Sequence, residues 1–472
     1  MSSPTLRFTV NGRELDARPG ETVLKAALRQ GVDIPHFCYH DKLSIAGSCR
    51  ICLVRVNNQP KLAPACNLPV TPNMVVETET EQVKAARENV LQFLFVNHPV
   101  DCGICDKAGE CRLQDYQHLY GPKQSLVRDP KHHKRKLHDV GPRITLDNER
   151  CILCSRCVRF TREISGSNAL GIVERGGHSY VEAQTPGRFD DAYSDNVIEL
   201  CPTGALLSKD FLYKCRVWFL QPVRSVCTGC ERACSIKVWK RMNVRQQHMS
   251  GTDSSHIAYR TTAWENPAVN GPWLCNKGYD QHKWMSRERI VQPLVAGRPV
   301  SPGQALAEAK RLFAAAQKPA VLVSSHASNE ELDVLKSVLR AVPAYVHRDW
   351  HPVAGEVVED ALLIKADKNP NRAGVVARFG DRAFDGAAGH DLVLVWGEVT
   401  APLPLGATPW IHLTPFATPA DPPAAAVIPV SNTWERCGSF TNFEGRHNAF
   451  EQVFDKPADV HHAADVFRGL AS

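Results

Sequence analysis

The chain has 472 residues, of which 43% are apolar and 22% are charged, with a net charge of +6 and 17 cysteines. Such a length is typical of several globular domains, and so small a net charge does not indicate a nucleic-acid partner. No apolar run approaches the roughly 18 residues of a membrane helix, and the first residues lack the pattern of a signal peptide. We therefore expect no direct membrane span and no export. The cysteines fall in tight groups, which in a chain that is not exported favours metal centres over disulfides.

The first module is predicted to be a compact α+β domain that ends near residue 78. Apolar residues alternate over 5–10, Asn11-Gly12 is a hairpin-turn signal, and residues 14–17 can form the returning strand. Residues 21–30 then have a helical pattern that is closed by Gly31.

The first cysteine group is predicted to hold a 2Fe–2S cluster. Thiolate sulfur suits iron and its bridging sulfides, and the spacing is close to the plant ferredoxin type, with ten residues in place of four in the first gap. The small residues around Gly47 allow backbone N–H groups to turn toward sulfur. The alternative is a zinc site, whose usual signature is two close cysteine pairs, whereas this group has only one. The four residues are Cys38, Cys49, Cys52 and Cys66.

The second module begins with a predicted helix over residues 81–97, which delivers His98 and is stopped by Pro99. Three cysteines at metal spacing follow, so His98 is predicted to be the fourth ligand; a structural histidine and a zinc site with the same four donors are the alternatives. The set is His98, Cys102, Cys105 and Cys111. A basic run over 131–136 is interpreted as a solvated loop or as a docking patch for an acidic partner. Without interleaved aromatic residues it is a weak candidate for single-stranded nucleic acid.

Two further sets follow in a loop-rich region. Cys151, Cys154, Cys157 and the distant Cys201 have the spacing of one 4Fe–4S cluster, since residue 161, where a second-cluster ligand would stand, is Thr. The last set comprises Cys227, Cys230, Cys234 and the distant Cys275. Cys215 and Cys437 are left over and are expected to be buried small apolar residues.

From about residue 300 the pattern becomes α/β. A helix is expected over 302–315, and short apolar strands over 320–324, 391–396 and 427–430 predict a small parallel sheet covered by helices. Prolines between residues 402 and 423 predict a long irregular connection.

The first three cysteine groups, in this order, resemble the G subunit of bacterial respiratory complex I, equivalent to the mitochondrial 75 kDa subunit. The resemblance is strong over residues 5–215, and its phrases are HPVDCGICDKAGEC at 98–111, CILC through REISG at 151–166, and CPTGAL at 201–206. It implies a β-grasp, ferredoxin-like 2Fe–2S domain, a 4Fe–4S cluster ligated by His98 with its three cysteines, and a second 4Fe–4S cluster on the electron path.

Residues 225–295 resemble the iron–sulfur domain of molybdopterin oxidoreductases, through WLCNKG at 273–278. This resemblance implies a third 4Fe–4S cluster on the Cys227 set, which is expected to be structural or off the main path. Residues 328–331, 369–374 and 440–446 are similar to that family's body but lie much closer together. We therefore expect a reduced α/β domain that binds no molybdopterin and catalyses nothing.

The expected architecture is a multidomain chain of mixed α+β and α/β class. Its predicted parts are a 2Fe–2S ferredoxin-like domain over 1–80, a 4Fe–4S domain ligated by one histidine and three cysteines over 81–145, a 4Fe–4S ferredoxin-like domain over 146–218, a molybdopterin-oxidoreductase-type 4Fe–4S domain over 219–298, and a truncated α/β domain over 299–472.

The resemblance implies an electron-transfer subunit of NADH:quinone oxidoreductase. Electrons would arrive from a partner subunit that oxidises NADH with FMN, and would leave toward other iron–sulfur and quinone-site subunits. The chain would lie in the peripheral arm, on the cytoplasmic face of the inner (plasma) membrane. Since the chain lacks a dinucleotide-binding Gly-x-Gly-x-x-Gly after a strand, hydride chemistry is assigned to the partner. The alternatives are an iron–sulfur subunit of a soluble NAD-linked hydrogenase or of a formate dehydrogenase complex, and a zinc-binding scaffold without redox chemistry.

Overall fold

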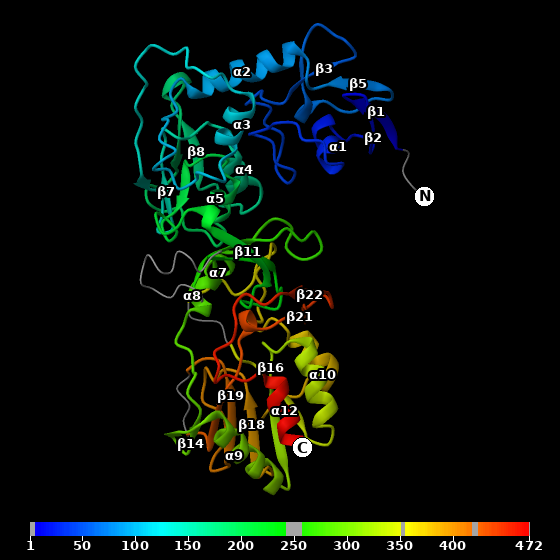
Figure 1. The fold of residues 1–472 in the computed structure, drawn as a ribbon, viewed down its shortest axis with the longest axis vertical. Helices are drawn as coiled ribbons and strands as arrows, with labels where there is room; N and C mark the ends of the chain where they lie inside the picture. Colours follow the sequence, from blue (N-terminus) through cyan, green and yellow to red (C-terminus); the bar gives the residue numbers. More distant parts are fainter. Residues whose placement is uncertain (1–4, 242–256, 351–354, 418–422, 472) are drawn as a thin grey trace. The chain divides into compact units, whose positions relative to one another are not determined.

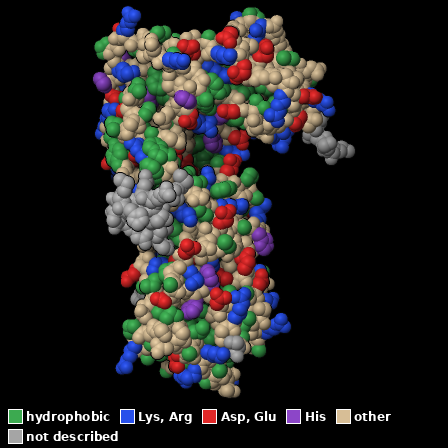
Figure 2. Space-filling view, in the orientation of Figure 1, with side chains coloured by type: hydrophobic (Ala, Val, Ile, Leu, Met, Phe, Trp, Pro, Cys, Tyr) green, Lys and Arg blue, Asp and Glu red, His purple; other side chains and the backbone are tan. Residues whose placement is uncertain are grey.

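The structure is a computed structural model that describes residues 5–241, 257–350, 355–417 and 423–471. It contains two compact units, residues 1–218 and 219–472 (Figure 1). None of the helices in these described ranges has the length and apolarity needed to cross a membrane. On the face drawn in Figure 2, basic and acidic side chains are interspersed over both units.

The first unit begins with a five-stranded mixed sheet, in the order β2-β1-β5-β3-β4, and one helix. Asn11 and Gly12 have φ values of 51° and 79°, which are the left-handed values that a tight hairpin turn requires. The predicted hairpin and helix are thereby confirmed, with Thr22 capping the helix through its side chain. The elements are β1 (Leu6–Val10), β2 (Arg13–Ala17), α1 (Val23–Arg29), β3 (Leu53–Val56), β4 (Ala63–Pro64) and β5 (Met74–Glu77).

The rest of the first unit consists of short elements joined by long loops. The predicted helix after residue 80 is confirmed, with Thr80 as its N-cap and an end two residues earlier than expected. Two small antiparallel sheets, β10-β7-β6 and β8-β9, support the loops. The elements are α2 (Glu81–Phe95), α3 (Arg112–Tyr120), β6 (His138–Asp139), β7 (Ile144–Leu146), α4 (Arg156–Glu163), β8 (Leu170–Val173), β9 (Tyr180–Ala183), α5 (Asn196–Leu200) and β10 (Leu206–Ser208).

The second unit opens with an antiparallel sheet in the order β11-β12-β13, followed by two short helices. A two-stranded ribbon, β21-β22, contacts β11 although it lies near the end of the chain. These elements are β11 (Leu220–Val226), β12 (Ser235–Arg241), β13 (Ala258–Ala263), α7 (Asn276–Tyr279), α8 (Gln281–Met285), β21 (Gly438–Thr441) and β22 (His447–Phe450).

A seven-stranded sheet, in the order β15-β14-β20-β19-β18-β16-β17, forms the body of the second unit. The strands β16 to β20 are parallel, and the β14-β15 hairpin extends one edge in antiparallel fashion. The predicted parallel sheet is thus confirmed. The strands are β14 (Leu294–Val295), β15 (Arg298–Pro299), β16 (Pro319–Ser324), β17 (Ala344–His347), β18 (Leu392–Trp396), β19 (Trp410–Thr414) and β20 (Ala426–Pro429).

In the described part of the chain, helices cover one face of this sheet. One apolar core joins that face to α9 (Pro302–Ala315), α10 (Asn329–Val338), α11 (Arg372–Phe379) and α12 (Ala463–Ala471), with α12 packed against both α9 and α10. A second core on other residues of the sheet is completed by irregular segments around Phe384 and Leu405. The expectation of a sheet simply covered by helices is correct for one face.

The prediction of one long irregular connection in the proline-rich stretch after residue 401 is wrong. It contains the fully buried strand β19, in which Trp410 pairs with Val393 of β18. The prolines flank the strand at Pro409 and Pro415 and therefore remove no hydrogen-bond donor from its interior. Pro419 and Pro422 lie outside the described residues.

Candidate iron–sulfur centres

The first cysteine set is assembled from two loops of the N-terminal sheet domain. Cys38, Cys49 and Cys52 lie between α1 and β3, and Cys66 lies in the 3-10 turn Ala65–Asn67. The thiol of Cys38 contacts those of Cys49 and Cys66, and Cys52 contacts Cys66. Contact with Cys49 and Cys66 holds the pKa of Cys38 far below its usual range, whereas contact with Cys38 and Cys52 raises the pKa of Cys66 far above it. Without a cation among them, these four sulfurs cannot all be thiolates.

Backbone N–H groups around this set point at sulfur, and those of Ser48 and Cys49, from the small-residue stretch, donate to the sulfur of Cys38 as predicted. Gly47 and Arg50 have left-handed φ values of 61° and 58°, which turn the chain around the thiols. The N–H of Cys38 donates to Cys49 Sγ at 3.5 Å. Such donors stabilise a thiolate ligand and the negative charge of a cluster.

The second set lies between α2 and α3. The ring of His98 packs edge-on against Phe95 of α2, and Cys111 is the residue that precedes α3. Burial lowers the pKa of His98 to about 4, so its ring is neutral, which is the form that binds a metal. Its Nδ1 atom is buried and has no hydrogen-bond partner among the described residues. An orphaned imidazole nitrogen close in sequence to three cysteines fits a metal ligand.

The three cysteines of this set are enclosed by other parts of the chain. Cys105 and Cys111 are buried, and burial raises the pKa of the Cys111 thiol to about 11. A Cβ atom built on Gly204 would lie 2.2 Å from Cys105 Sγ, so the glycine is required for this approach. The CPTGAL phrase of the third set therefore also forms part of the wall of the second.

The basic run beside this set is engaged within the unit. Lys131 Nζ donates to the carbonyl of Phe95 at 2.6 Å, at the end of α2. Lys134 Nζ donates to the Ser179 carbonyl at 2.6 Å, and Lys136 forms an ion pair with Glu149 at 2.9 Å. These contacts anchor the run at three lysines, while His132, His133, Arg135 and Lys136 are exposed. The run is therefore a solvated loop that is fixed to the unit at several points, and its role as a docking patch stays a prediction.

The third set converges on one cavity at the start of α4. All four cysteines line it: Cys151, Cys154, Cys157 and Cys201. Leu153 and Ser155 have left-handed φ values of 52° and 58°, and the N–H of Leu153 donates to Cys151 Sγ at 3.4 Å. Burial raises the pKa of Cys154 to about 11. Four enclosed thiols around one cavity fit the donor chemistry of a 4Fe–4S cluster.

The fourth set lies in the second unit, where the structure brings Cys275 to the other three cysteines. Cys227 directly follows β11, and its N–H donates to the carbonyl of Cys234 at 2.8 Å. Burial raises the pKa of Cys275 to about 12, with a smaller contribution from the charge of Cys230. The N–H of Gly229 donates to Cys227 Sγ at 3.4 Å. The long gap in sequence is therefore closed in space.

Within the described ranges, no three His, Cys, Asp or Glu side chains are placed as ligands of a single metal ion. The two cysteines outside the sets differ from expectation. Cys437 is exposed and Cys215 is partly exposed, so the prediction that both are buried is wrong. Cys437 directly precedes β21 and, unlike Phe440 within that strand, does not face its core.

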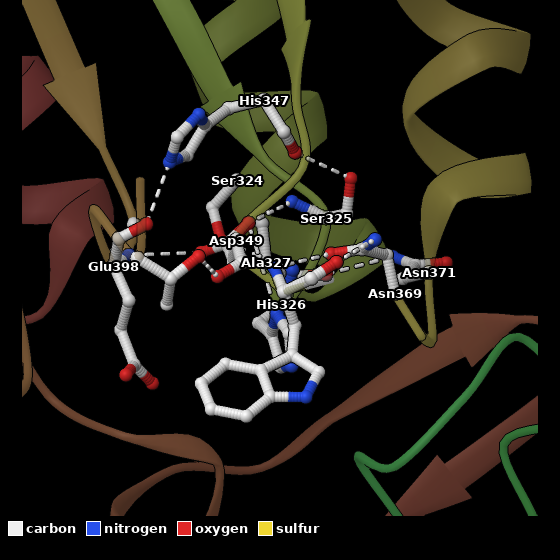
Figure 3. A network of polar contacts seen from close by, with 12 residues as sticks. Ser324, Ser325, His326, Ala327, His347, Asp349, Asn369, Asn371 and Glu398 are labelled. Carbon is white, nitrogen blue, oxygen red and sulfur yellow. Dashed lines mark hydrogen bonds and ion pairs between the residues drawn. The ribbon is translucent and has the colours of Figure 1, made fainter. Parts of the chain in front are cut away.

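The second unit also contains a polar network that the sequence analysis did not single out (Figure 3). Asp349, which follows β17, accepts hydrogen bonds from Ser324 Oγ at 2.7 Å and from the N–H of Ser325 at 2.8 Å. It also accepts from the N–H of Glu398 at 3.0 Å, and His326 Nδ1 lies 3.7 Å away. Burial opposes ionisation of Asp349, but the contact with His326 outweighs it and the pKa stays below its usual value.

This network lies at the carboxyl ends of the parallel strands, where the strand order reverses between β16 and β18. Open α/β sheets place ligand sites at such a point. Gly397, with a φ of 121°, lets the chain pass Asp349, since a Cβ there would lie 2.0 Å from Oδ2. In the sequence, the available signal for this network was the position of Ser325 and Gly397 directly after the strands predicted over 320–324 and 391–396.

Three protein-family models match the chain. Residues 3–81 match "2Fe-2S iron-sulfur cluster binding domain", and residues 87–125 match "NADH-ubiquinone oxidoreductase-G iron-sulfur binding region". Residues 141–207 match "NADH-quinone oxidoreductase subunit 3, ferredoxin-like domain". The first three predicted sets lie one in each matched range, and the fourth lies outside all three.

Curated relatives include the G subunit of the NADH-quinone oxidoreductase of Rickettsia bellii, 37% identical over 292 residues, which are 61% of this chain and 40% of the relative. The corresponding G subunit of Rickettsia felis is 34% identical over 71% of this chain and 49% of its own length. The NADH-ubiquinone oxidoreductase 75 kDa subunit of Reclinomonas americana is 39% identical over 61% of this chain and 39% of its own.

The chain therefore spans about half or less of the length of the curated relatives it matches. Among solved structures, a chain of an NAD+-reducing [NiFe]-hydrogenase in the H2-reduced state is 32% identical, with a TM-score of 0.41, over 45% of this chain and 91% of that one.

Proposed function

We propose that this chain, a homologue of the G and 75 kDa subunits of NADH-quinone oxidoreductases, is an iron–sulfur electron-transfer subunit of NADH:quinone oxidoreductase. In this role it relays electrons from an NADH/FMN-binding subunit toward quinone. The observation that carries the proposal is the convergence of three cysteine sets within one unit.

A single apolar core supports this convergence. It contains Phe37 and Ile51, which adjoin the first set, and Cys111 of the second. It also packs against Cys49 of the first set and against Ile152, which follows Cys151 of the third. One-electron transfer through protein requires centres held close together in a low-dielectric interior. The shared core supports the proposal because it joins segments of all three sets within the first unit.

The proposed ligand assignment follows the four sets. Each cluster supplies one-electron redox chemistry when bound. The first set is assigned one 2Fe–2S cluster and the others one 4Fe–4S cluster each. The assigned residues are Cys38, Cys49, Cys52 and Cys66; His98, Cys102, Cys105 and Cys111; Cys151, Cys154, Cys157 and Cys201; and Cys227, Cys230, Cys234 and Cys275.

The chain's own contribution is to bind, enclose and tune these centres. The N–H groups of Cys38, Leu153 and Gly229 donate to ligand sulfur, which favours the thiolate form. Burial of the thiols excludes water. Neutral His98 supplies nitrogen where the second set has only three cysteines, and a neutral ligand leaves that centre less negative than one held by four thiolates.

The partners in this proposal are the NADH/FMN subunit and further iron–sulfur and quinone-site subunits, and the place is the peripheral arm on the cytoplasmic face of the membrane. The five domains predicted over 1–80, 81–145, 146–218, 219–298 and 299–472 are part of the proposal. So is a C-terminal α/β region that serves as a scaffold without molybdopterin.

Metal and acid-labile sulfide analysis of the anaerobically purified chain tests the cofactors. We expect about fourteen irons per chain and no stoichiometric zinc, from one 2Fe–2S and three 4Fe–4S clusters. About ten irons would remove only the Cys227 cluster, whereas one or more zinc ions per chain would contradict the whole proposal. Recovery with quinone-site subunits, rather than with a hydrogenase or formate dehydrogenase subunit, tests the assignment to the complex.

A further inference from the structure

Two arginines of α4, Arg156 and Arg159, are buried between the first and third cysteine sets. They are one helical turn apart, and only 5% and 4% of their surfaces are exposed. Arg159 donates to the carbonyl of Cys38 at 2.5 Å and to the carbonyl of Cys154 at 3.3 Å. One guanidinium therefore joins a ligand loop of the first set to a ligand loop of the third.

Arg156 spans the same gap one turn earlier. It donates to the carbonyl of Tyr39, next to Cys38, at 2.5 Å, and to the carbonyl of Leu200, next to Cys201, at 3.3 Å. Its Nε is buried without a hydrogen-bond partner in the part of the chain that the structure describes. The side chain thus has a donor left over at the centre of the gap.

Neither guanidinium forms an ion pair with a carboxylate among the residues that the structure describes. The carboxylate that acts electrostatically on Arg159 is Glu163, and it is engaged by Ser44 and Arg162. The hydrogen bonds that they make go to carbonyl groups and, for Arg159, to the Ser155 hydroxyl as well. Arg150, which is also buried, is compensated in the usual way, by an ion pair with Asp101 at 2.6 Å. A buried charge without a direct ion-pair partner is unfavourable, so two adjacent ones indicate that an anion completes the site.

Arg156 lines the pocket of the third set together with its four cysteines. The carbonyl groups that it contacts belong to Tyr39 and Leu200, the neighbours of Cys38 and Cys201. If the cations served only as caps for carbonyl groups, a neutral amide side chain could perform the same task without burying charge. The pair of arginines therefore matches centres whose net charge is negative, which clusters held by four thiolates are.

We infer that Arg156 and Arg159 are positioning residues that act as shared counterions of the Cys38 and Cys151 centres and raise the reduction potentials of both. The inference rests on the proposed function. Reduction adds one electron to a centre that is already negative, and a guanidinium against its ligand loop stabilises that added charge. Because Arg159 contacts both loops, its removal acts on both centres together.

The test is a redox titration of the full chain, followed by the EPR signals of the 2Fe–2S cluster and of the Cys151 4Fe–4S cluster. For Arg159→Gln we expect both centres to become harder to reduce, with at least a tenfold change in each one-electron equilibrium constant, or about 59 mV. The control is Arg162→Gln, which removes an exposed arginine of the same helix that pairs with Glu163. It should leave both potentials within a twofold change.

The conservative variants Arg159→Lys and Arg156→Lys separate charge from carbonyl capping. They keep the charge and lose part of the hydrogen bonding, so we expect potentials within about threefold of wild type, even if Arg159→Gln does not fold. Three results would overturn the inference. They are equal falls in reduction potential in the lysine and glutamine variants, unchanged potentials in a fully loaded Arg159→Gln chain, and a tenfold or larger change of the one-electron equilibrium constant in Arg159→Lys alone. Absence of the two EPR signals from the wild-type chain would instead contradict the proposed function.

Discussion

Gly204 and Cys105 lie so close together that position 204 has no room for any side chain. The Cβ of an alanine there would be 2.2 Å from Cys105 Sγ and 3.3 Å from the Cβ of Lys107. Gly204 belongs to the loop that carries Cys201, whereas Cys105 belongs to the proposed His98 centre. Two centres that are distant in sequence thus share one wall.

Gly204→Ala is therefore expected to disturb the His98 centre more than the centre whose loop it belongs to. A free thiol could rotate away from the new methyl group, but a thiolate fixed to iron cannot, so the variant should lose most of one 4Fe–4S EPR signal and about four irons per chain. Gly177→Ala is the control, since an added Cβ there meets no atom within 4 Å. A fully loaded Gly204→Ala chain would show that Cys105 is free to move.

His98→Ala should abolish or alter one 4Fe–4S spectrum and leave the 2Fe–2S signal intact. The reason is that His98 offers a neutral ring with a nitrogen that no described residue partners, where only three cysteines are available. EPR spectra of the reduced chain measure both signals in one sample. His118→Ala, on the exposed face of α3, is the matched control. An unchanged set of spectra would make His98 structural.

Cys275→Ser is expected to lower the yield of assembled protein more than the turnover of the complex that does assemble. The fourth set lies in the second unit, outside the shared core of the other three, and we propose that its cluster is structural or off the main path. Iron content, yield and NADH:quinone activity per assembled complex are compared with Cys437→Ser, which alters an exposed thiol. Loss of activity in a fully assembled Cys275→Ser complex would contradict this prediction.

The pair of His326 and Asp349 should make the thermal stability of the chain depend on pH. Burial opposes the charged ring, but Asp349 outweighs it and raises the pKa of His326, while contact with His326 helps to lower the pKa of Asp349. The histidine's contribution is full below its unfolded pKa of about 6.5 and is lost as pH rises through the higher folded value. The carboxylate's contribution is present above about 3.8, the pKa of an unfolded aspartate, and falls only in stronger acid.

His326→Gln should therefore reduce the free energy of unfolding by about 1–3 kcal/mol near pH 6, and by less at pH 9. Thermal unfolding curves at the two pH values measure the difference. The other groups that face the pair are Glu398, which donates its N–H to Asp349, and His347, whose ring contacts the Glu398 carbonyl. The control His118→Gln leaves this network intact, and equal losses at both pH values would exclude the ion pair as their cause.

Local patterns were sufficient for the elements whose signals lie within a few residues. The Asn11-Gly12 turn, the helix from Glu81 and the helix Pro302–Ala315 are set by turn chemistry, caps and apolar spacing, and they were predicted within two residues. The strand β19 was not predicted, because proline-rich segments flank it and because a strand that is buried on both faces lacks the alternation of apolar and polar residues that marks a half-buried strand.

Other relationships could not be predicted from spacing. The sheet β11-β12-β13 brings the chain back so that Cys275 lies near Cys230. The number of residues between two cysteines does not predict such an approach. Gly204 against Cys105 and Asp349 against Gly397 are contacts between loops. The close groups of the proposed ligand sets could be recognised from spacing, whereas the distant members Cys201 and Cys275 could not. Counterions such as Arg159 could not be recognised either, because their partners are backbone carbonyls, which every residue has.

The apolar core beneath the three cysteine loops of the first unit also governs how the protein is damaged by oxygen. When oxidation strips iron from one set, its thiols are left buried, and the loosened loop uncovers side chains such as Phe37 and Tyr116 that support the neighbouring sets. Loss of iron from one set should therefore make the neighbouring sets more sensitive to oxidation. In a partly bleached sample, molecules that have already lost one cluster are then expected to lose the others faster than intact molecules do.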